Sequence, residues 1–450
     1  MRELVLAVDS PEQITRAART LRGVARHAII TPETIVETLE QWSAGLESRE
    51  VRDIPGVTFL RLWLRRGTLE AILARELGWE ALHGGWHEEG RAKLRAFPIG
   101  VVGHWPAGNI EIQPILSLTC ALLGGNSCLV RVPTGLVSAT RLLMAKLQEA
   151  DRGGLLTDRI SMVSFEHSRT DLHEAMARAV DGAMIWGGAE SLRYVRALPF
   201  PDWARVITFG PRVSVAAMEA SAWSDPAERR SWCRRIARDV WQFEQQACSS
   251  PQALFLERSA TGDPRQFVDE LAQAFREENR THSRREIEPA LTSAICQARA
   301  SWLLDDVANA ATFPSSPDWT ILVGEHREMP KPTQGRTLSV LVADDLFSVI
   351  SKFDGGVQTL GLAMMDVQKE EALAEAAARQ GVDRVVKLGQ MHVFCSPWDG
   401  TDLVRPMTRM VRHVSSSDGK TEQENGRWAA VSGSVGAKGQ VFRAGGASDV

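Results

Sequence analysis

Apolar residues recur at helical spacing early in the chain and in an alternating strand and helix pattern after it. Stretches 34–42 and 68–77 show the three- and four-residue spacing of amphipathic helices, which we expect to pack on the domain that follows. From Ala96 the expected strands cover 99–103, 128–132, 160–164 and 182–186, and the expected helices cover 114–123, 138–149 and 171–179. This alternation predicts a mostly parallel, doubly wound α/β sheet with ligands at the carboxyl ends of its strands.

A further amphipathic helix leads to a cysteine. Asp225 and Pro226 mark its start, and an apolar stripe follows at positions 232, 236, 240, 243 and 247. The stripe predicts that Cys248 lies at the helix exit, and that Pro251 separates it from an apolar strand over 252–256. A side chain held between a buried helix and a strand suits a nucleophile. The alternative is a small buried apolar residue, as most free cysteines are.

Composition narrows the setting. A chain of 450 residues with 44% hydrophobic content can form two domains. The net charge of -4 is small and both signs are dispersed, so neither a nucleic acid nor a membrane is an expected partner. The start lacks a signal-peptide pattern, which predicts a cytoplasmic protein. The six cysteines show no CxxC pairing, so we expect neither a metal site nor disulfides.

Two loops in the alternating part are candidate binding segments. Asn109 follows the first strand, and its amide could donate to a developing oxyanion or could simply favour a turn. His104, in the same loop, is either a proton donor to a leaving group or a structural histidine. Gly187 and Gly188 stand between a strand and a helix, where backbone amides could face a phosphate. The dinucleotide fingerprint GxGxxG is absent from the sequence.

Five segments in order carry a resemblance to a known family. They are the Pro98 to Asn109 loop, GGNSCLVRV, IWGGAES, ITFGP and QQACSSP. This set resembles the aldehyde dehydrogenase superfamily over residues 96–412. It is more similar to the acyl-CoA reductase branch typified by LuxC-type long-chain fatty acid (acyl-protein thioester) reductases, as is the later sequence PWDG. The resemblance implies a Rossmann-like cofactor-binding domain plus an α/β catalytic domain.

The implied domains and roles can be placed along the chain. We expect an N-terminal helical segment over 1–95, a cofactor-binding domain over 96–210, a catalytic domain over 211–412 and a flexible tail over 413–450. The resemblance makes Cys248 the nucleophile and Asn109 the oxyanion-hole amide. It implies that the cofactor is bound by Arg131, Gly187, Gly188 and Trp105.

Two departures from ordinary aldehyde dehydrogenases refine the expected chemistry. Thr208 stands where those enzymes keep the glutamate that activates water, and a hydroxyl cannot act as a base at neutral pH. An acyl-enzyme would therefore resist hydrolysis and could wait for hydride. No acid follows Arg131 closely in sequence, and arginine without a carboxylate tolerates a 2′-phosphate, which favours NADPH.

The expected function is NADPH-dependent reduction of an acyl-CoA or acyl-carrier-protein thioester, fatty acyl in type, to the aldehyde through an acyl-Cys248 intermediate. The alternatives are an aldehyde dehydrogenase acting oxidatively, and a non-redox acyl-transfer or acyl-binding subunit. The activation of Cys248 stays open, since Glu244 is either a proton shuttle or a structural carboxylate. Expected partners are an acyl-transferring enzyme and further copies of the chain.

Overall fold

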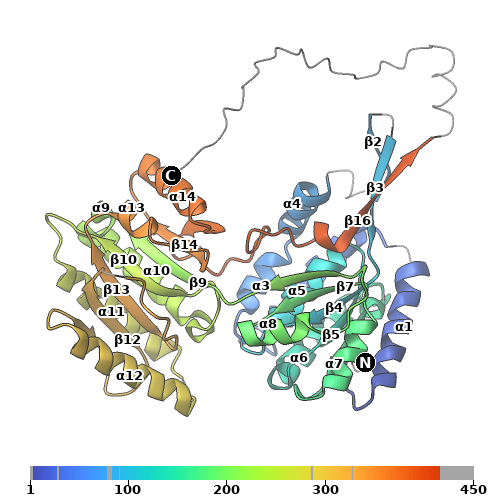
Figure 1. Ribbon diagram of the computed structural model, residues 1–450, viewed down its shortest axis with the longest axis horizontal. Helices are drawn as coiled ribbons and strands as arrows, with labels where there is room; N and C mark the ends of the chain where they lie inside the picture. Colours follow the sequence, from blue (N-terminus) through green and yellow to red (C-terminus); the bar gives the residue numbers. More distant parts are fainter. Residues whose placement is uncertain are drawn as a thin grey trace, which may run out of the picture.

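The computed structural model describes residues 4–27, 30–78, 84–90, 92–284, 287–326 and 328–415. They form two lobes that lie side by side, each built on a mainly parallel sheet (Figure 1), and a smaller antiparallel sheet that projects from the first lobe. The tail predicted over 413–450 falls outside the described residues from 416 on.

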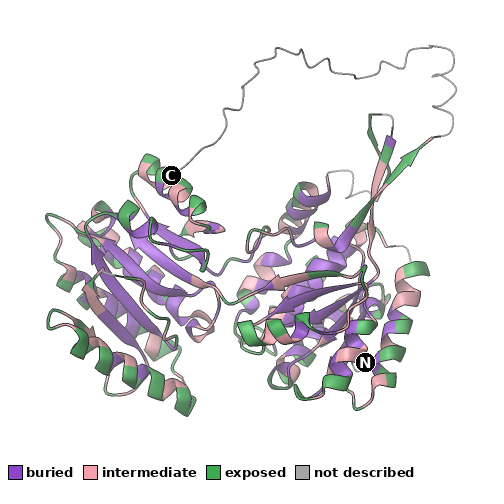
Figure 2. Ribbon diagram, viewed as in Figure 1, coloured by how far each residue is buried: buried purple, intermediate pink, exposed green. Residues whose placement is uncertain are grey.

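The first lobe contains a six-stranded parallel sheet in the order β1-β6-β5-β4-β7-β8. Its central strands are buried on both faces, as parallel strands covered by helices must be (Figure 2). The strands are β1 (Val5–Ala7), β4 (Val101–Trp105), β5 (Ser127–Arg131), β6 (Ile160–Ser164), β7 (Gly182–Trp186) and β8 (Arg205–Phe209).

Helices cover both faces of this sheet, so the predicted doubly wound arrangement is confirmed. On one face pack α2 (Pro32–Gly45), α3 (Val57–Trp63), α4 (Arg66–Leu77), α5 (Gln113–Leu123) and α6 (Val137–Ala150). On the other lie α1 (Pro11–His27), α7 (Thr170–Arg178) and α8 (Ala189–Arg196). Short 3₁₀ turns are η2 (Thr134–Leu136) and η3 (Thr157–Arg159).

The second lobe contains a seven-stranded sheet in the order β11-β12-β13-β10-β9-β14-β15, parallel except for β11. Its strands are β9 (Val213–Met218), β10 (Pro251–Glu257), β11 (Ala310–Thr312), β12 (Thr320–Glu325), β13 (Thr337–Ala343), β14 (Val357–Ala363) and β15 (Arg384–Lys387). The helices on its two faces are α9 (Ala220–Ser224), α10 (Pro226–Trp241), α11 (Pro264–Thr281), α12 (Pro289–Asp305), α13 (Leu346–Ile350) and α14 (Val367–Arg379).

The chain returns from β15 to the first lobe through residues 388–407, which end in η5 (Arg405–Met407). The buried carboxylate of Glu76 on α4 anchors this return segment, accepting hydrogen bonds from the backbone N–H groups of Leu403 (3.1 Å), Val404 (2.7 Å) and Arg405 (2.7 Å). The segment continues into β16 (Thr408–Val414), which joins β2 (His87–Glu89) and β3 (Ala92–Pro98) in the antiparallel sheet.

The N-terminal segment is not only helical. β1 pairs with β6 and completes the first sheet, so residues before 96 are part of that sheet's lobe as well as packed on it. Only Val5 of the three β1 residues is buried, and a single buried position gives no readable periodicity.

Candidate active site

Cys248 lies in a loop between α10 and β10, and the prediction that it ends a helix is wrong. The helix ends at Trp241, after which Phe243, Glu244 and Gln245 adopt left-handed backbone conformations with φ of 54°, 54° and 60°. Each such non-glycine residue costs on the order of 1–2 kcal/mol, so surrounding contacts must fix the conformation.

Gln245 provides much of that fixation. Its buried side chain donates through Nε2 to the carbonyl oxygens of Pro251 and Thr337, both at 2.7 Å, and accepts from the Thr337 backbone N–H at 2.7 Å. The side chain thus joins the loop to the starts of β10 and β13. These bonds stabilise an otherwise unfavourable backbone at a fixed place in the sheet.

The loop is held from both lobes. Ser214, at the start of β9, donates its hydroxyl hydrogen to the Cys248 carbonyl oxygen at 2.6 Å. Asn109, in the loop after β4 of the first lobe, donates from Nδ2 to the Gln246 carbonyl oxygen at 3.0 Å. Cys248 therefore lies where the carboxyl edge of the first sheet faces the amino edge of the second.

Cys248 is a half-buried residue, and its thiol is protonated at neutral pH. Burial and the nearby Asp399 carboxylate raise the pKa of the thiol to about 11. A Gln358 hydrogen bond, the Arg384 guanidinium and the Ser249 backbone N–H each lower this pKa, but by less. A thiol with so high a pKa needs a proton acceptor before it can attack. The sequence did not predict Gln358, Arg384 or Asp399 as neighbours, because strands distant in the chain bring them together.

The residue after the cysteine is fixed by a buried histidine. His392 Nε2 lies 2.7 Å from the Asp239 carbonyl oxygen, which can only accept, so Nε2 carries the hydrogen. Burial lowers the pKa of His392 to about 4, so the ring is neutral and Nδ1 accepts from the Ser249 hydroxyl at 2.9 Å. With both nitrogens engaged, His392 positions the loop and has no proton to exchange with Cys248.

The two other residues that the sequence offers as an acid or a base, Glu244 and His104, have structural roles. Glu244 forms ion pairs with Arg284 and Arg336, which supports its structural reading. His104 is fully buried in β4, bonded through Nδ1 to Ser117 Oγ at 2.8 Å, and burial lowers its pKa to about 3. A neutral ring inside the first sheet cannot protonate a leaving group.

Arg131, Gly187 and Gly188 lie at the same edge of the first sheet, at the carboxyl ends of β5 and β7, with β4 between these strands. Arg131 ends β5, where its Nη2 donates to the Phe165 carbonyl oxygen at 3.4 Å and its buried Nε has no partner among the described residues. Gly187 and Gly188 form the turn into α8, and a Cβ at Gly188 would meet no atom within 4 Å. An orphaned guanidinium N–H and an open helix start are compatible with a phosphorylated ligand.

Two observations revise the cofactor expectations. Glu166 follows β6, and its charge acts on the Arg131 guanidinium. A carboxylate is therefore near Arg131 in space, although none follows it closely in sequence. The Trp105 indole is 3% exposed, donates to His173 Nδ1 at 3.0 Å and packs edge-on against Phe200, so the structure does not support a direct cofactor contact by this side chain.

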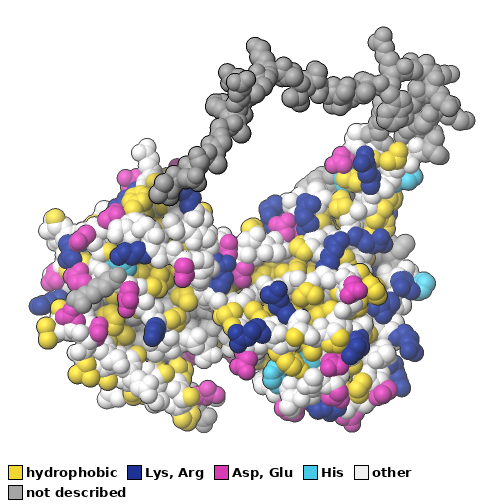
Figure 3. All heavy atoms as spheres, in the orientation of Figure 1, with side chains coloured by type: hydrophobic (Ala, Val, Ile, Leu, Met, Phe, Trp, Pro, Cys, Tyr) yellow, Lys and Arg dark blue, Asp and Glu magenta, His cyan; other side chains and the backbone are white. Residues whose placement is uncertain are grey.

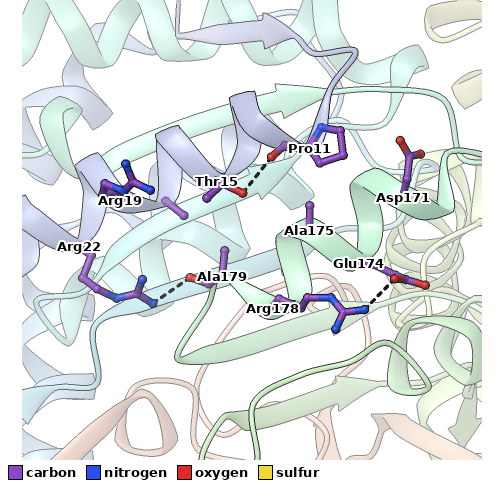
Figure 4. A pocket seen from close by; sticks show the side chains of 10 residues that line it. Pro11, Thr15, Arg19, Arg22, Asp171, Glu174, Ala175, Arg178 and Ala179 are labelled. Carbon is purple, nitrogen blue, oxygen red and sulfur yellow. Dashed lines mark hydrogen bonds and ion pairs between the residues drawn. The ribbon is translucent and has the colours of Figure 1, made fainter.

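A surface groove elsewhere on the first lobe contains none of these residues. It has a volume of about 560 Å³, lies between α1 and α7, and is bordered by the Arg178–Glu174 ion pair and by Arg22, which donates to the Ala179 carbonyl oxygen at 2.9 Å (Figure 4). Charges of both signs are scattered over the visible face of both lobes (Figure 3). Within the described ranges no helix is long and apolar enough to cross a membrane, and no three potential metal ligands cluster.

Comparisons with known proteins agree with this arrangement. The long-chain acyl-protein thioester reductase of Vibrio harveyi is 24% identical over 361 residues, which span 78% of this chain and 71% of the relative. A protein of the same name from Photorhabdus laumondii is 22% identical over 355 residues, 78% of this chain and 70% of the relative.

Solved structures with the same fold include a lactaldehyde dehydrogenase, at a TM-score of 0.66 and 14% identity over 90% of this chain and 92% of that one. Proline utilization A of Bradyrhizobium japonicum aligns at a TM-score of 0.66 and 17% identity over 92% of this chain and 46% of that one. The aldehyde dehydrogenase-like fold is thereby confirmed. The family model described as acyl-CoA reductase (LuxC) matches residues 36–413, so the chain belongs to that family.

Proposed function

We propose that this protein reduces a fatty acyl thioester to the aldehyde with NADPH, through a covalent acyl-Cys248 intermediate. The observation that carries the proposal is the placement of a partly exposed cysteine between the two lobes, next to an amide from the first lobe. Membership of the acyl-CoA reductase (LuxC) family and relatives named long-chain acyl-protein thioester reductase support it.

The residues at the loop fit acyl transfer. The Cys248 sulfur attacks the thioester carbonyl, and the negative oxygen needs hydrogen-bond donors. The Cys248 backbone N–H has no hydrogen-bond partner among the described residues. Asn109 uses one N–H of its amide on Gln246 and keeps the second. Thr208, on β8, supplies no carboxylate to activate water, which favours reduction over hydrolysis of the acyl-enzyme.

The cofactor site supports a nicotinamide dinucleotide. Arg131 would hold the adenosine ribose and its 2′-phosphate, and Gly187 and Gly188 would leave room for the pyrophosphate at the start of α8. When bound, the reduced cofactor supplies the hydride that converts the acyl group to the aldehyde. Coenzyme A or acyl-carrier protein as donor, an acyl-transferring partner enzyme, a homo-oligomeric state and a cytoplasmic location remain predictions.

The test is to incubate the purified protein with NADPH and a series of acyl-CoA and acyl-carrier-protein thioesters, following cofactor oxidation and aldehyde formation. We expect both products from the wild type and neither from Cys248→Ala. Cys395→Ala, which removes another partly exposed cysteine, should retain activity. Activity that survives Cys248→Ala would refute the mechanism. Reduction of NADP by aldehyde without coenzyme A would favour the oxidative alternative, and the absence of NADPH binding the non-redox one.

A further inference from the structure

A carboxylate from the return segment lies near the cysteine loop. Asp399 is hydrogen-bonded to Gln358, and the next residue, Thr359, pairs in the sheet with Ser214, which donates to the Cys248 carbonyl oxygen. Asp399 sits in a turn closed by two backbone hydrogen bonds between Trp398 and Thr401, at 3.0 and 2.9 Å. Its backbone is left-handed, with φ of 50°, and its side chain is partly exposed. Asp399 therefore occupies an enforced position with access to solvent or substrate.

The side-chain amide of Gln358 acts on both Asp399 and Cys248. Gln358, at the start of β14, is fully buried, and its Nε2 donates to Asp399 Oδ1. Gln358 also lowers the pKa of the Cys248 thiol, which is the effect of an N–H donor near a thiolate. Nε2 carries two hydrogens and is the only donor of this side chain, so it can serve the sulfur and the carboxylate together.

The surrounding charges set the protonation states. Burial raises the pKa of Asp399, and Asp383 raises it further, while Gln358, Arg212 and Arg384 lower it. Arg384 is fixed over the Trp398 ring at 4.2 Å and donates to the Val393 carbonyl oxygen at 3.0 Å. The pKa of the Cys248 thiol is raised to about 11, so at neutral pH Cys248 is protonated, with the Asp399 side chain near it.

We propose that Asp399 is a catalytic residue that takes the proton of Cys248 during attack and returns it to the departing carrier thiolate, with Gln358 positioning both groups. This inference rests on the proposed function. It answers how the cysteine is activated, for which Glu244 and His392 are engaged elsewhere.

The step balances in atoms and charge. The S–H bond of Cys248 breaks as its sulfur bonds to the acyl carbon, and Asp399 becomes a neutral carboxylic acid. The tetrahedral oxyanion collapses, and the bond between the acyl carbon and the carrier sulfur breaks. The carrier thiolate leaves with the Asp399 proton as a free thiol, and Asp399 returns to a carboxylate. No oxidant or reductant takes part in this half-reaction.

The experiment separates acyl transfer from thiol reactivity. Release of coenzyme A from an acyl-CoA is followed in a single turnover without NADPH, and alkylation of Cys248 by iodoacetamide is followed by peptide mass spectrometry across pH. In Asp399→Asn we expect coenzyme A release to slow by about 100-fold or more, since general acid–base catalysis contributes about that much. The midpoint of the alkylation profile should nevertheless move to lower pH, because the negative charge that disfavours the thiolate is gone.

Further variants make the sign of the effect decisive. Gln358→Leu should move the alkylation midpoint to higher pH, opposite to Asp399→Asn, because the thiolate loses a donor. Asp399→Glu should recover part of the acyl-transfer rate. Asp402→Asn is the matched control: Asp402 lies three residues later and pairs with Arg75 at 3.0 Å, so it should leave both measurements unchanged. The wild-type protein gives a second, independent test. Its acyl-transfer rate should fall at acidic pH as Asp399 becomes protonated.

Each outcome bears on one claim. If Asp399→Asn releases coenzyme A at the wild-type rate, or if its alkylation midpoint does not fall, the proposed role of Asp399 is wrong. The proposed function is not affected by either result. If the wild type releases no coenzyme A from any acyl-CoA or acyl-carrier substrate, the proposed function itself fails. If Asp399→Asn does not fold, a wild-type acyl-transfer rate that stays flat down to about pH 4, near the usual carboxyl pKa, would overturn the inference.

Discussion

At the residue scale, the candidate site consists of a thiol with a raised pKa and the groups that would make it reactive. Burial and Asp399 disfavour the Cys248 thiolate, while Gln358 and Arg384 favour it. This balance keeps the sulfur as a thiol at rest, which protects it from adventitious oxidation and alkylation. It also means that chemistry requires a proton acceptor, and the fold supplies one from a distant segment.

Cofactor choice is a prediction at this scale. Glu166 acts on Arg131, and its negative charge should oppose a 2′-phosphate there. We expect Glu166→Gln to raise the ratio of kcat/KM for NADPH over NADH by about 2- to 5-fold, the size of one exposed charge interaction. Steady-state kinetics with both cofactors measures the ratio. Glu174→Gln, an exposed carboxylate on α7, is the control, and an unchanged or lowered ratio in Glu166→Gln would contradict the assignment.

The sequence could identify part of this site. Cys248 and Asn109 stand in local motifs, and the structure places their loops in contact. The sequence could not predict that Gln358, Arg384 and Asp399 lie near Cys248. They stand in no local motif around the cysteine, and the tertiary fold alone brings them to the cysteine loop. The single available signal for Asp399 was the PWDG sequence in the resemblance. The resemblance implies a cofactor role for Trp105, but its side chain is buried in the core of the first lobe.

At the element scale, the alternating pattern predicted the first sheet well. The strands expected over 160–164 and 182–186 coincide with β6 and β7, since each is a short, mostly buried run rich in apolar residues. The end of α10 was mispredicted because the apolar spacing continues beyond the helix by coincidence. The left-handed residues 243–245 are not glycines, so nothing local in the sequence marks the break.

The attachment of the return segment to α4 gives a second prediction. Glu76→Ala removes the acceptor for three backbone N–H groups, two of which belong to the buried residues Leu403 and Val404. We expect a loss of about 3 to 5 kcal/mol in the free energy of unfolding, measured by urea denaturation. We also expect reduced acyl transfer, because the same segment carries Asp399. The exposed Glu70 on the same helix is the control, and Glu70→Ala should cost under about 1 kcal/mol. Equal losses in the two variants would show that Glu76 does not anchor the segment.

At the scale of the whole molecule, buried histidines link stability to pH. Burial lowers the pKa of His104 to about 3 and those of His173 and His392 to about 4. Above about pH 6.5 each ring is neutral in both states. As pH falls below that value the unfolded chain binds protons that the folded protein does not, so stability is lost between about pH 6.5 and pH 4. Asp239 acts in the opposite direction, because burial raises its pKa to about 7.

One histidine can be isolated from this balance. His173→Gln keeps an acceptor for the Trp105 indole N–H but cannot be protonated. The stability lost between pH 7 and pH 5 should therefore shrink by about 2 kcal/mol relative to the wild type, from about 1.4 kcal/mol per pH unit below the unfolded pKa. Urea denaturation at the two pH values measures it. His413→Gln, at an exposed position, should match the wild type, and an unchanged loss in His173→Gln would rule out this linkage.

The central claim is that Cys248, held between the lobes, carries the acyl group, and intact-protein mass spectrometry tests it most directly. The protein is mixed with an acyl thioester in the absence of NADPH, and its mass is compared before and after NADPH is added. The account predicts one acyl adduct on the wild type and on Cys395→Ala, none on Cys248→Ala, and disappearance of the adduct as aldehyde forms once NADPH is present. An adduct that persists in Cys248→Ala, or aldehyde formed by that variant, would contradict it.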